Sequence, residues 1–252
     1  MGDIETERTD EGKVYSFQKM NFRYKYSKKF LKNKTVLDVG CGYGYGAELL
    51  KKFDYTGVDY YNKAIEKAQK KYPKSKFLQM EIPPLKFFDN TFDNVVCLEV
   101  IEHVPEEKGM EMLKEIYRVL KNGGILFLST PNGDNRDELM DNHFIEYGSE
   151  QLQALMKKNG FKIKYVGGLS IPFIFGYKKY PVWLKEWYGT SGENKSKLKE
   201  VMTQSNIAKD SLIKRLFTLV GMIGIKIFGV LMIYSGYLFP QKAEYQILVC
   251  EK

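Results

Sequence analysis

The stretch Thr35-Val-Leu-Asp-Val-Gly-Cys-Gly-Tyr-Gly-Tyr-Gly46 decides how this chain is read. Its apolar run, residues 36–39, is typical of a strand buried in a parallel sheet that is covered on both faces. Glycine lacks a Cβ, so it lets a backbone turn sharply and approach a ligand closely. Four glycines follow the run at alternate positions: Gly40, Gly42, Gly44 and Gly46. A helix beginning at Ala47 would point its first N–H groups back at that ligand.

Two carboxylates strengthen the prediction of a ligand over a plain strand–helix turn. Asp38 lies at the end of the first strand, and Asp59 closes the next apolar run, residues 55–59. An acid about twenty residues after a glycine loop stands at the tip of the second strand, where it can accept hydrogen bonds from both ribose hydroxyls. The pattern therefore indicates a cofactor that contains a nucleoside.

The identity of that cofactor depends on Asp38. Gly42-Tyr-Gly-Tyr-Gly-Ala47 fits the dinucleotide pattern G-x-G-x-x-G/A, which keeps NAD as an alternative. A carboxylate two residues before the first glycine would repel a pyrophosphate, whereas it suits a ligand with an ammonium and a sulfonium. Here the sequence resembles the class I S-adenosylmethionine (SAM) methyltransferases, whose first motif is V-L-D-x-G-C-G-x-G. The sequence favours SAM over NAD.

The resemblance also implies residues for the rest of the cofactor site. Arg23, in Asn21-Phe-Arg-Tyr24, matches a segment that related enzymes place near the methionine carboxylate, although a solvated arginine is the alternative. Glu81 stands where the family has an acid near the adenine amino group, commonly Asp, and Leu98 stands near the methionyl part. The predicted cofactor-binding residues are Arg23, Asp38, Gly40, Gly42, Gly44, Asp59, Tyr60, Glu81, Ile82 and Leu98.

The predicted fold is α/β, a Rossmann-like class I methyltransferase fold with helices on both faces of a seven-stranded, mostly parallel sheet. In this fold the seventh strand runs antiparallel between the fifth and sixth. The apolar patterns predict strands at 35–39, 55–59, 76–80, 92–98, 125–131, 161–168 and 243–250. They predict helices at 16–32, from 47, at 62–72, at 105–120 and at 149–159, the last capped by Ser149.

The chemistry is expected at the carboxyl ends of the fourth and fifth strands, beside the first strand, where open α/β sheets bind ligands. A hydroxyl acceptor must lose its proton during methyl transfer, and the chain has only two histidines, His103 and His143. We predict His103 and Glu102 as catalytic residues and His143 as a substrate contact. The alternative for both histidines is a loop-orienting hydrogen bond.

A divalent metal is the less favoured alternative at the same place. Glu99-x-x-Glu102-His103 resembles a segment of the ubiquinone-biosynthesis O-methyltransferases in which similar residues support a metal. The same letters occur in relatives without a metal, so we assign no metal ligands.

The chain divides into a predicted SAM-binding domain, 1–168 with 243–252, and an insertion, 169–242. Long insertions on a rigid sheet usually carry specificity. Residues 170–226 hold ten Lys or Arg against four Asp or Glu, most of the net charge of +8, and residues 216–239 are mainly apolar. This composition suits a helix lying on an anionic membrane surface, with a buried lid over the active site as the alternative. Spanning is disfavoured, because the last strand must return to the sheet.

The remaining signals place the protein in a reducing compartment. The three cysteines, Cys41, Cys97 and Cys250, are far apart in apolar settings, which argues for reduced buried thiols, and residues 1–8 are polar and acidic, unlike a secretory leader. Motifs such as His143-Phe-Ile-Glu146 resemble methyltransferases of glycan assembly. We predict a cytoplasmic O-methyltransferase that associates peripherally with the membrane and acts on a small-molecule or lipid-linked acceptor.

Two alternative functions remain consistent with the sequence. An RNA methyltransferase is favoured by the positive charge, but amino-group nucleic-acid methyltransferases carry Asp/Asn-Pro-Pro-Tyr/Phe where this chain has Glu99-Val-Ile-Glu102. A non-catalytic SAM-fold module that binds a partner through the insertion is disfavoured by the intact glycines, Asp38 and Asp59. The oligomeric state has no signal in the sequence.

Overall fold

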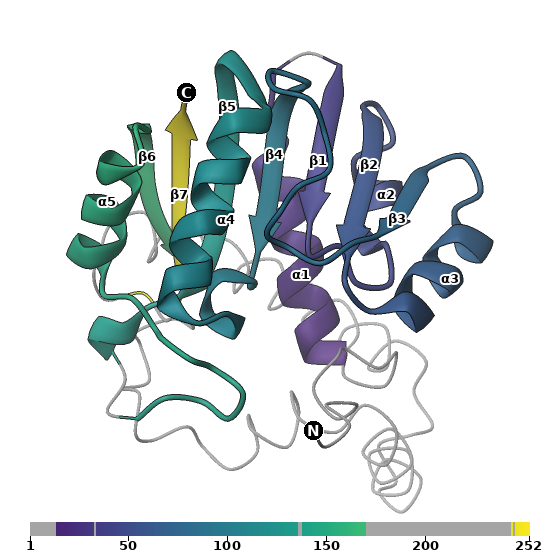
Figure 1. The fold of residues 1–252 in the computed structure, drawn as a ribbon. Coiled ribbons are helices and arrows are strands. Elements are labelled where there is room, and N and C mark those ends of the chain that lie inside the picture. The colour runs from purple at the N-terminus through teal and green to yellow at the C-terminus, as the bar shows by residue number, and fades with distance from the viewer. Residues whose placement is uncertain (1–13, 33, 136–137, 170–242, 244) are drawn as a thin grey trace, which may run out of the picture.

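A seven-stranded sheet with the order β3-β2-β1-β4-β5-β7-β6 organises the chain (Figure 1). The computed structural model describes residues 14–32, 34–135, 138–169, 243 and 245–252. All pairings among β1 to β5 are parallel, and β7 is antiparallel to both β5 and β6. The strands are β1 (Thr35–Val39), β2 (Asp54–Asp59), β3 (Lys76–Gln79), β4 (Phe92–Leu98), β5 (Leu120–Pro131), β6 (Lys162–Leu169) and β7 (Tyr245–Glu251). The predicted fold class and the place of the last strand are confirmed.

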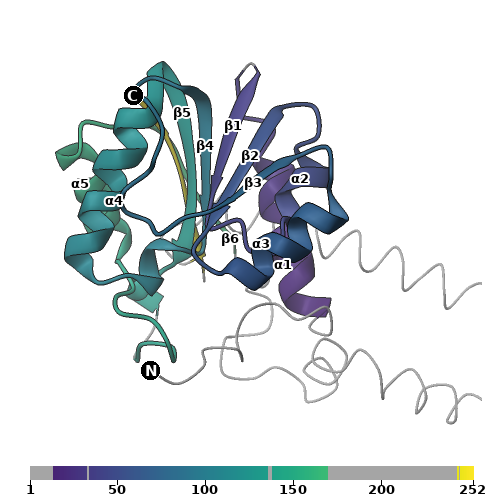
Figure 2. The ribbon, with the colours of Figure 1, turned by 45° about the vertical axis from the view of Figure 1, so that its right-hand side comes forward.

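Helices cover both faces of the sheet, as Figures 1 and 2 show. They are α1 (Val14–Ser27), α2 (Tyr45–Leu49), α3 (Asn62–Lys71), α4 (Glu106–Val119) and α5 (Ser149–Lys158), with short 3-10 turns at Ile101–His103 and Gly133–Asn135. Alternate strand residues face opposite ways. Leu37 and Val39 therefore pack with α4 and α5, whereas Val36 packs with α1, α2 and α3. Two apolar cores result, one on each face.

Most element boundaries lie within two residues of the predictions, and three differences have a clear structural cause. Strand β5 begins at Leu120, not 125, because Leu120 pairs with Phe92 and the glycines after it bond the chain end: Gly123 N donates to Lys252 O at 3.0 Å. Helix α1 ends at Ser27, not 32, where the Ser27 hydroxyl donates to Tyr24 O at 2.8 Å.

The third correction concerns the start of α5. Its N-cap is Gly148, not Ser149. The Gln151 side chain accepts a bond from Gly148 N at 3.0 Å, and the Asp134 carboxylate accepts one from Ser149 N at 2.7 Å. One side chain within the helix, Gln151, and one from an earlier turn, Asp134, thus satisfy the helix start that Ser149 was expected to cap.

The predicted insertion lies outside the described residues, apart from its first residue, Leu169, which ends β6. The same holds for the apolar segment 216–239. Among the helices that the structure describes, none is long and apolar enough to cross a membrane. The prediction of three buried, free cysteines is confirmed.

Candidate active site

The glycine loop between β1 and α2 adopts the backbone that only glycine takes easily. Gly40, Gly42 and Gly44 have φ values of +74°, +51° and +75°. A Cβ on Gly44 would stand 2.8 Å from the Phe77 ring, so that glycine serves packing. A Cβ on Gly42 would meet nothing within 4 Å. Gly42 therefore faces open space, as a residue that a ligand approaches closely must.

Asp59 is clamped to this loop at the carboxyl end of β2. Its Oδ2 accepts a bond from Gly42 N and its Oδ1 one from Tyr61 N, both at 2.9 Å. A carboxylate oxygen can accept more than one hydrogen bond, so this clamp is compatible with ribose hydroxyls as further donors. Tyr60 beside it is exposed, and Met80 N donates to Asp59 O at 2.9 Å, which brings the start of the Glu81 loop to the same edge.

Asp38 is fully buried under the loop. Its Oδ2 accepts bonds from Tyr24 Oη at 2.9 Å and Tyr55 Oη at 2.5 Å, whereas its Oδ1 has no hydrogen-bond partner in the part of the chain that is described. Burial raises the pKa of the Asp38 carboxyl to about 7, against the opposing effect of the two hydroxyls. An unpartnered buried acceptor fits the ammonium group of SAM.

Arg23 is buried between β4 and β7, so it is not a solvated arginine. Its Nη2 lies 3.2 Å from Glu99 Oε2, and its Cζ lies 4.5 Å from the centroid of the Tyr245 ring. Its Nε has no hydrogen-bond partner among the described residues. A buried guanidinium with an unused donor fits the carboxylate of a SAM methionine.

The other predicted cofactor residues occupy three different environments. Leu98 is buried at the end of β4, Ile82 is half-buried against the core that includes α4, and Glu81 is exposed. The structure thus groups the glycine loop, Asp38 and Asp59 tightly, while Glu81 and Tyr60 lie at the rim.

Glu99 and Glu102 follow β4 in two contrasting states. Glu99 has a φ of +55° and accepts a bond from Ser129 Oγ at 2.7 Å, besides its ion pair with Arg23. Glu102 is buried, and its Oε2 accepts a bond from Thr130 Oγ1 at 2.9 Å. Burial, followed by the charge of Glu99, raises the pKa of Glu102 well above its ordinary value. The two carboxyl groups therefore have different surroundings, since Glu99 faces the Arg23 guanidinium and Glu102 is buried against Thr130.

The two histidines meet at this edge although forty residues separate them in the sequence. Their ring centroids are 4.7 Å apart at an interplanar angle of 82°. His103 Nδ1 lies 3.0 Å from the carbonyl oxygen of Asn142, and His143 Nδ1 lies 2.6 Å from Glu146 Oε1. Each histidine thus has one ring nitrogen fixed by an acceptor.

Among the residues that the structure describes, one group of side chains could serve as metal ligands. Ligand atoms of Glu102, His103 and His143 all lie within 4.8 Å of one another. This set differs from the Glu99-x-x-Glu102-His103 segment considered in the sequence, because Glu99 turns to Arg23 and Ser129 and His143 takes its place. We assign the three side chains no metal.

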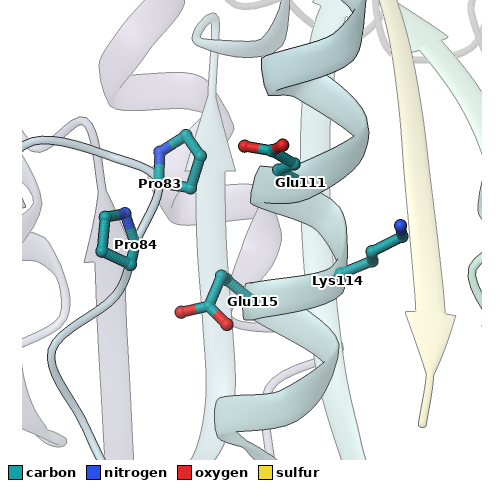
Figure 3. A pocket seen from close by; sticks show the side chains of 5 residues that line it. All are labelled: Pro83, Pro84, Glu111, Lys114 and Glu115. Carbon is teal, nitrogen blue, oxygen red and sulfur yellow. The ribbon is translucent and has the colours of Figure 1, made fainter.

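A surface depression on the flank of α4 is separate from this edge (Figure 3). Its lining consists of Pro83, Pro84, Glu111, Lys114 and Glu115. None of these residues belongs to the glycine loop or to the histidine cluster, and Glu115 already bonds Arg118 and Leu85 N. The depression is not part of the candidate active site.

Sequence reasoning missed three residues of this edge. Tyr245 on β7 faces Arg23 only because β7 inserts beside β5, which no local signal reveals. Glu99 was noted only within a metal-binding resemblance. Glu146 had a usable signal, since it stands three residues after a histidine and the two side chains bond each other.

The comparisons with known proteins agree with this arrangement. Residues 37–128 match the methyltransferase domain family. A probable S-adenosylmethionine-dependent methyltransferase of Mycobacterium tuberculosis is 33% identical over 135 residues, 51% of this chain and 48% of that protein. A ubiquinone biosynthesis O-methyltransferase of Coxiella burnetii is 38% identical over 109 residues, 40% of this chain and 45% of that protein.

A crystal structure of a SAM-dependent methyltransferase from Archaeoglobus fulgidus shares the fold, with a TM-score of 0.60 at 18% identity over 94% of each chain. The chain spans about half the length of the curated relatives it matches. The matched segment contains the glycine loop, Asp38 and Asp59. Residues 37–128 therefore carry a methyltransferase domain of the class I SAM-dependent type, and the cofactor of that domain is SAM.

Proposed function

We propose that this protein transfers a methyl group from SAM to an oxygen of an acceptor with a large apolar part, either a lipid-linked glycan or a quinone-like lipid. The observation that carries the proposal is the loop at residues 138–148. It presents His143 beside His103 and exposes the large apolar side chains of Leu139, Met140 and Phe144. A proton acceptor bordered by exposed apolar side chains suits a hydroxyl on an amphiphilic molecule.

The residues of the two sides of the site have different tasks in this reaction. SAM, when bound, supplies an electrophilic methyl group on its sulfonium. Asp59 holds the ribose, and Asp38 and Arg23 hold the amino acid end, so that the methyl group is fixed in place. Holding donor and acceptor in line supplies most of the acceleration. A histidine on the β4–β5 side removes the hydroxyl proton.

An RNA ribose methyltransferase is the second candidate, because the acceptor there is also a hydroxyl. It draws support from the net charge of +8. The apolar side chains around His143 weigh against it, since the phosphate backbone calls for a cationic rim.

The experiment follows radiolabelled methyl groups from SAM. The purified full chain is incubated with a lipid extract and, separately, with total RNA, both from the source organism carrying a deletion of the gene. Label should enter the lipid fraction, and Asp59→Ala should abolish the transfer. Label in RNA alone would support the second candidate, and label in neither fraction would contradict both.

We further propose that residues 212–239, which lie outside the described residues, meet an anionic membrane surface. The support is compositional: an apolar run with Arg215 and Lys226 three helical turns apart. The full chain should sediment with phosphatidylglycerol vesicles and leave phosphatidylcholine vesicles unbound. If the protein binds neither kind of vesicle, the membrane proposal fails and the segment is instead assigned as a lid over the active site.

A further inference from the structure

The contact between His143 and Glu146 sets one of the two histidines apart. His143 Nδ1 and Glu146 Oε1 are 2.6 Å apart, and the side chains are only 6% and 2% exposed. A carboxylate oxygen accepts hydrogen bonds, so the short contact assigns Nδ1 of His143 as the donor. In the neutral imidazole the lone pair then lies on Nε2, the nitrogen turned away from Glu146.

The contact at Nδ1 of His103 is with a neutral group. This nitrogen lies 3.0 Å from the carbonyl oxygen of Asn142, and the side chain of His103 is exposed. A carboxylate stabilises a neighbouring imidazolium more than a carbonyl does, because the hydrogen bond then joins opposite charges. The contact with Glu146 therefore favours proton uptake by His143.

The backbone of the loop fixes this pair at the reactive edge. Phe144 N donates to Glu102 O at 2.8 Å, which ties the loop to the turn after β4, and His143 N donates to Met140 O at 3.1 Å. A ring nitrogen of His143 lies within 4.8 Å of ligand atoms of Glu102 and His103. The pair thus stands where the fourth and fifth strands end, on the side of the acceptor.

We infer that His143 is the catalytic base of the methyl transfer and that Glu146 is its positioning residue, an inference that rests on the proposed function. The acceptor hydroxyl gives its proton to Nε2 of His143 while its oxygen forms the new bond to carbon. The sulfur–methyl bond breaks with its electron pair left on sulfur, giving S-adenosylhomocysteine. The imidazolium, paired with Glu146, then releases the proton to water. His103 orients the loop through Asn142, in place of the basic role that the sequence predicts for it.

The first test needs no acceptor, because a chain with two histidines gives only two imidazoles in nitrogen-15 NMR. In the His103→Asn variant, the only imidazole signals that remain are those of His143. We expect a neutral imidazole protonated at Nδ1, with a strongly downfield Nδ1 proton that Glu146→Ala removes. A neutral His143 protonated at Nε2 would overturn the inference and leave the methyltransferase proposal standing.

The second test measures methyl transfer to the deletion-strain lipid extract at saturating SAM. His143→Asn should lower the maximum rate by about 10²–10⁴, the usual contribution of a positioned base. Glu146→Gln should lower it by about 10–100-fold, as loss of an orienting partner does. Neither should change the half-saturating amount of extract. The matched control is Glu48→Gln. Glu48 pairs with Lys51, also three residues away, but this pair is exposed, so the change should leave the rate unchanged.

The outcomes separate the possible failures. Full activity in Glu146→Gln would contradict the positioning role of Glu146. A loss of activity in His103→Asn as large as in His143→Asn would contradict the assignment of His143 as the base. Activity that a chelator abolishes and Mn²⁺ restores would make the histidines metal ligands and overturn the acid–base assignment. A parent protein that methylates no fraction would contradict the proposed function itself, whatever the NMR result.

Discussion

The two sides of the sheet's carboxyl edge are built on different principles. On the cofactor side, backbone groups carry the geometry: three glycines have positive φ, and the N–H groups of Gly42 and Tyr61 clamp Asp59. On the acceptor side, side chains contact side chains, as in Glu102 with Thr130 and His143 with Glu146, and the rings of His103 and His143 meet across forty residues of sequence. Loss of one anchoring residue on the cofactor side should therefore disrupt cofactor binding as a whole. A substitution on the acceptor side should impair only the function of the residue that is replaced.

The largest effect expected on the cofactor side is that of Asp59→Ala. The change removes two hydrogen bonds to ribose hydroxyls, worth about 1.5–3 kcal/mol each because the acceptor is charged. It also frees the glycine loop. The Kd for S-adenosylhomocysteine in calorimetry should rise by about 10²–10⁴-fold.

The matched control is Asp54→Ala, at the exposed start of the same strand, which should bind like the parent. NADH should bind neither protein. An Asp59→Ala protein that keeps parental affinity would show that the ribose does not lie on this carboxylate.

Asp38 links the cofactor side to the pH dependence of stability. Its folded pKa of about 7 lies above the value of 3.8 expected in the unfolded chain, so the folded protein holds a proton that the unfolded chain gives up. The stability that this carboxyl contributes is complete below about pH 4 and is lost as the pH rises to about 7. The folded and unfolded pKa values of Asp38 differ by about three, and at about 1.4 kcal/mol per pKa unit this difference amounts to ~4 kcal/mol of stability.

Urea unfolding without cofactor at about pH 4 and pH 7.5 measures this loss. Relative to Asp38→Asn, the parent should lose about 4 kcal/mol of unfolding free energy between the two pH values. A difference between the two proteins that is the same at both pH values would contradict the buried, proton-holding state of Asp38.

Two glycine variants distinguish packing from ligand contact within one loop. Both Gly42→Ala and Gly44→Ala place a side chain at positive φ, at a cost of about 1–2 kcal/mol. Gly44→Ala adds the overlap with Phe77 and Ala68, about 1–3 kcal/mol more. Thermal unfolding should thus show Gly44→Ala as the less stable protein. Calorimetry should show Gly42→Ala as the weaker binder of S-adenosylhomocysteine, and the reverse order in either measurement would contradict these roles.

The smallest effect concerns the ring beneath Arg23. Tyr245→Leu removes a cation–π contact worth about 0.5–2 kcal/mol, so the Kd for S-adenosylhomocysteine should rise by about threefold to thirtyfold. Tyr245→Phe retains the ring and should bind more tightly than Tyr245→Leu. Equal binding by the leucine and phenylalanine variants would mean that Arg23 needs no support from β7.

The difference between the two sides also explains how far sequence reasoning reached. Asp38, Gly42 and Asp59 lie within one strand–loop–helix–strand unit, where glycine spacing and apolar runs are local signals. The pairing of Glu146 with His143 could be sought from its three-residue spacing, but the approach of His143 to His103 depends on how a long loop folds back on β4. Tyr245 required the order of the sheet itself. Local backbone rules thus predict the glycine loop with Asp38 and Asp59, and tertiary packing completes the rest of the site.

A crystal structure of the full chain with S-adenosylhomocysteine tests the two-sided site most directly. We predict the ribose hydroxyls on the Asp59 carboxylate, the methionine carboxylate on Arg23, and the sulfur open toward Nε2 of His143. A ligand whose sulfur faces away from the histidines, or whose ribose lies off Asp59, would contradict this prediction.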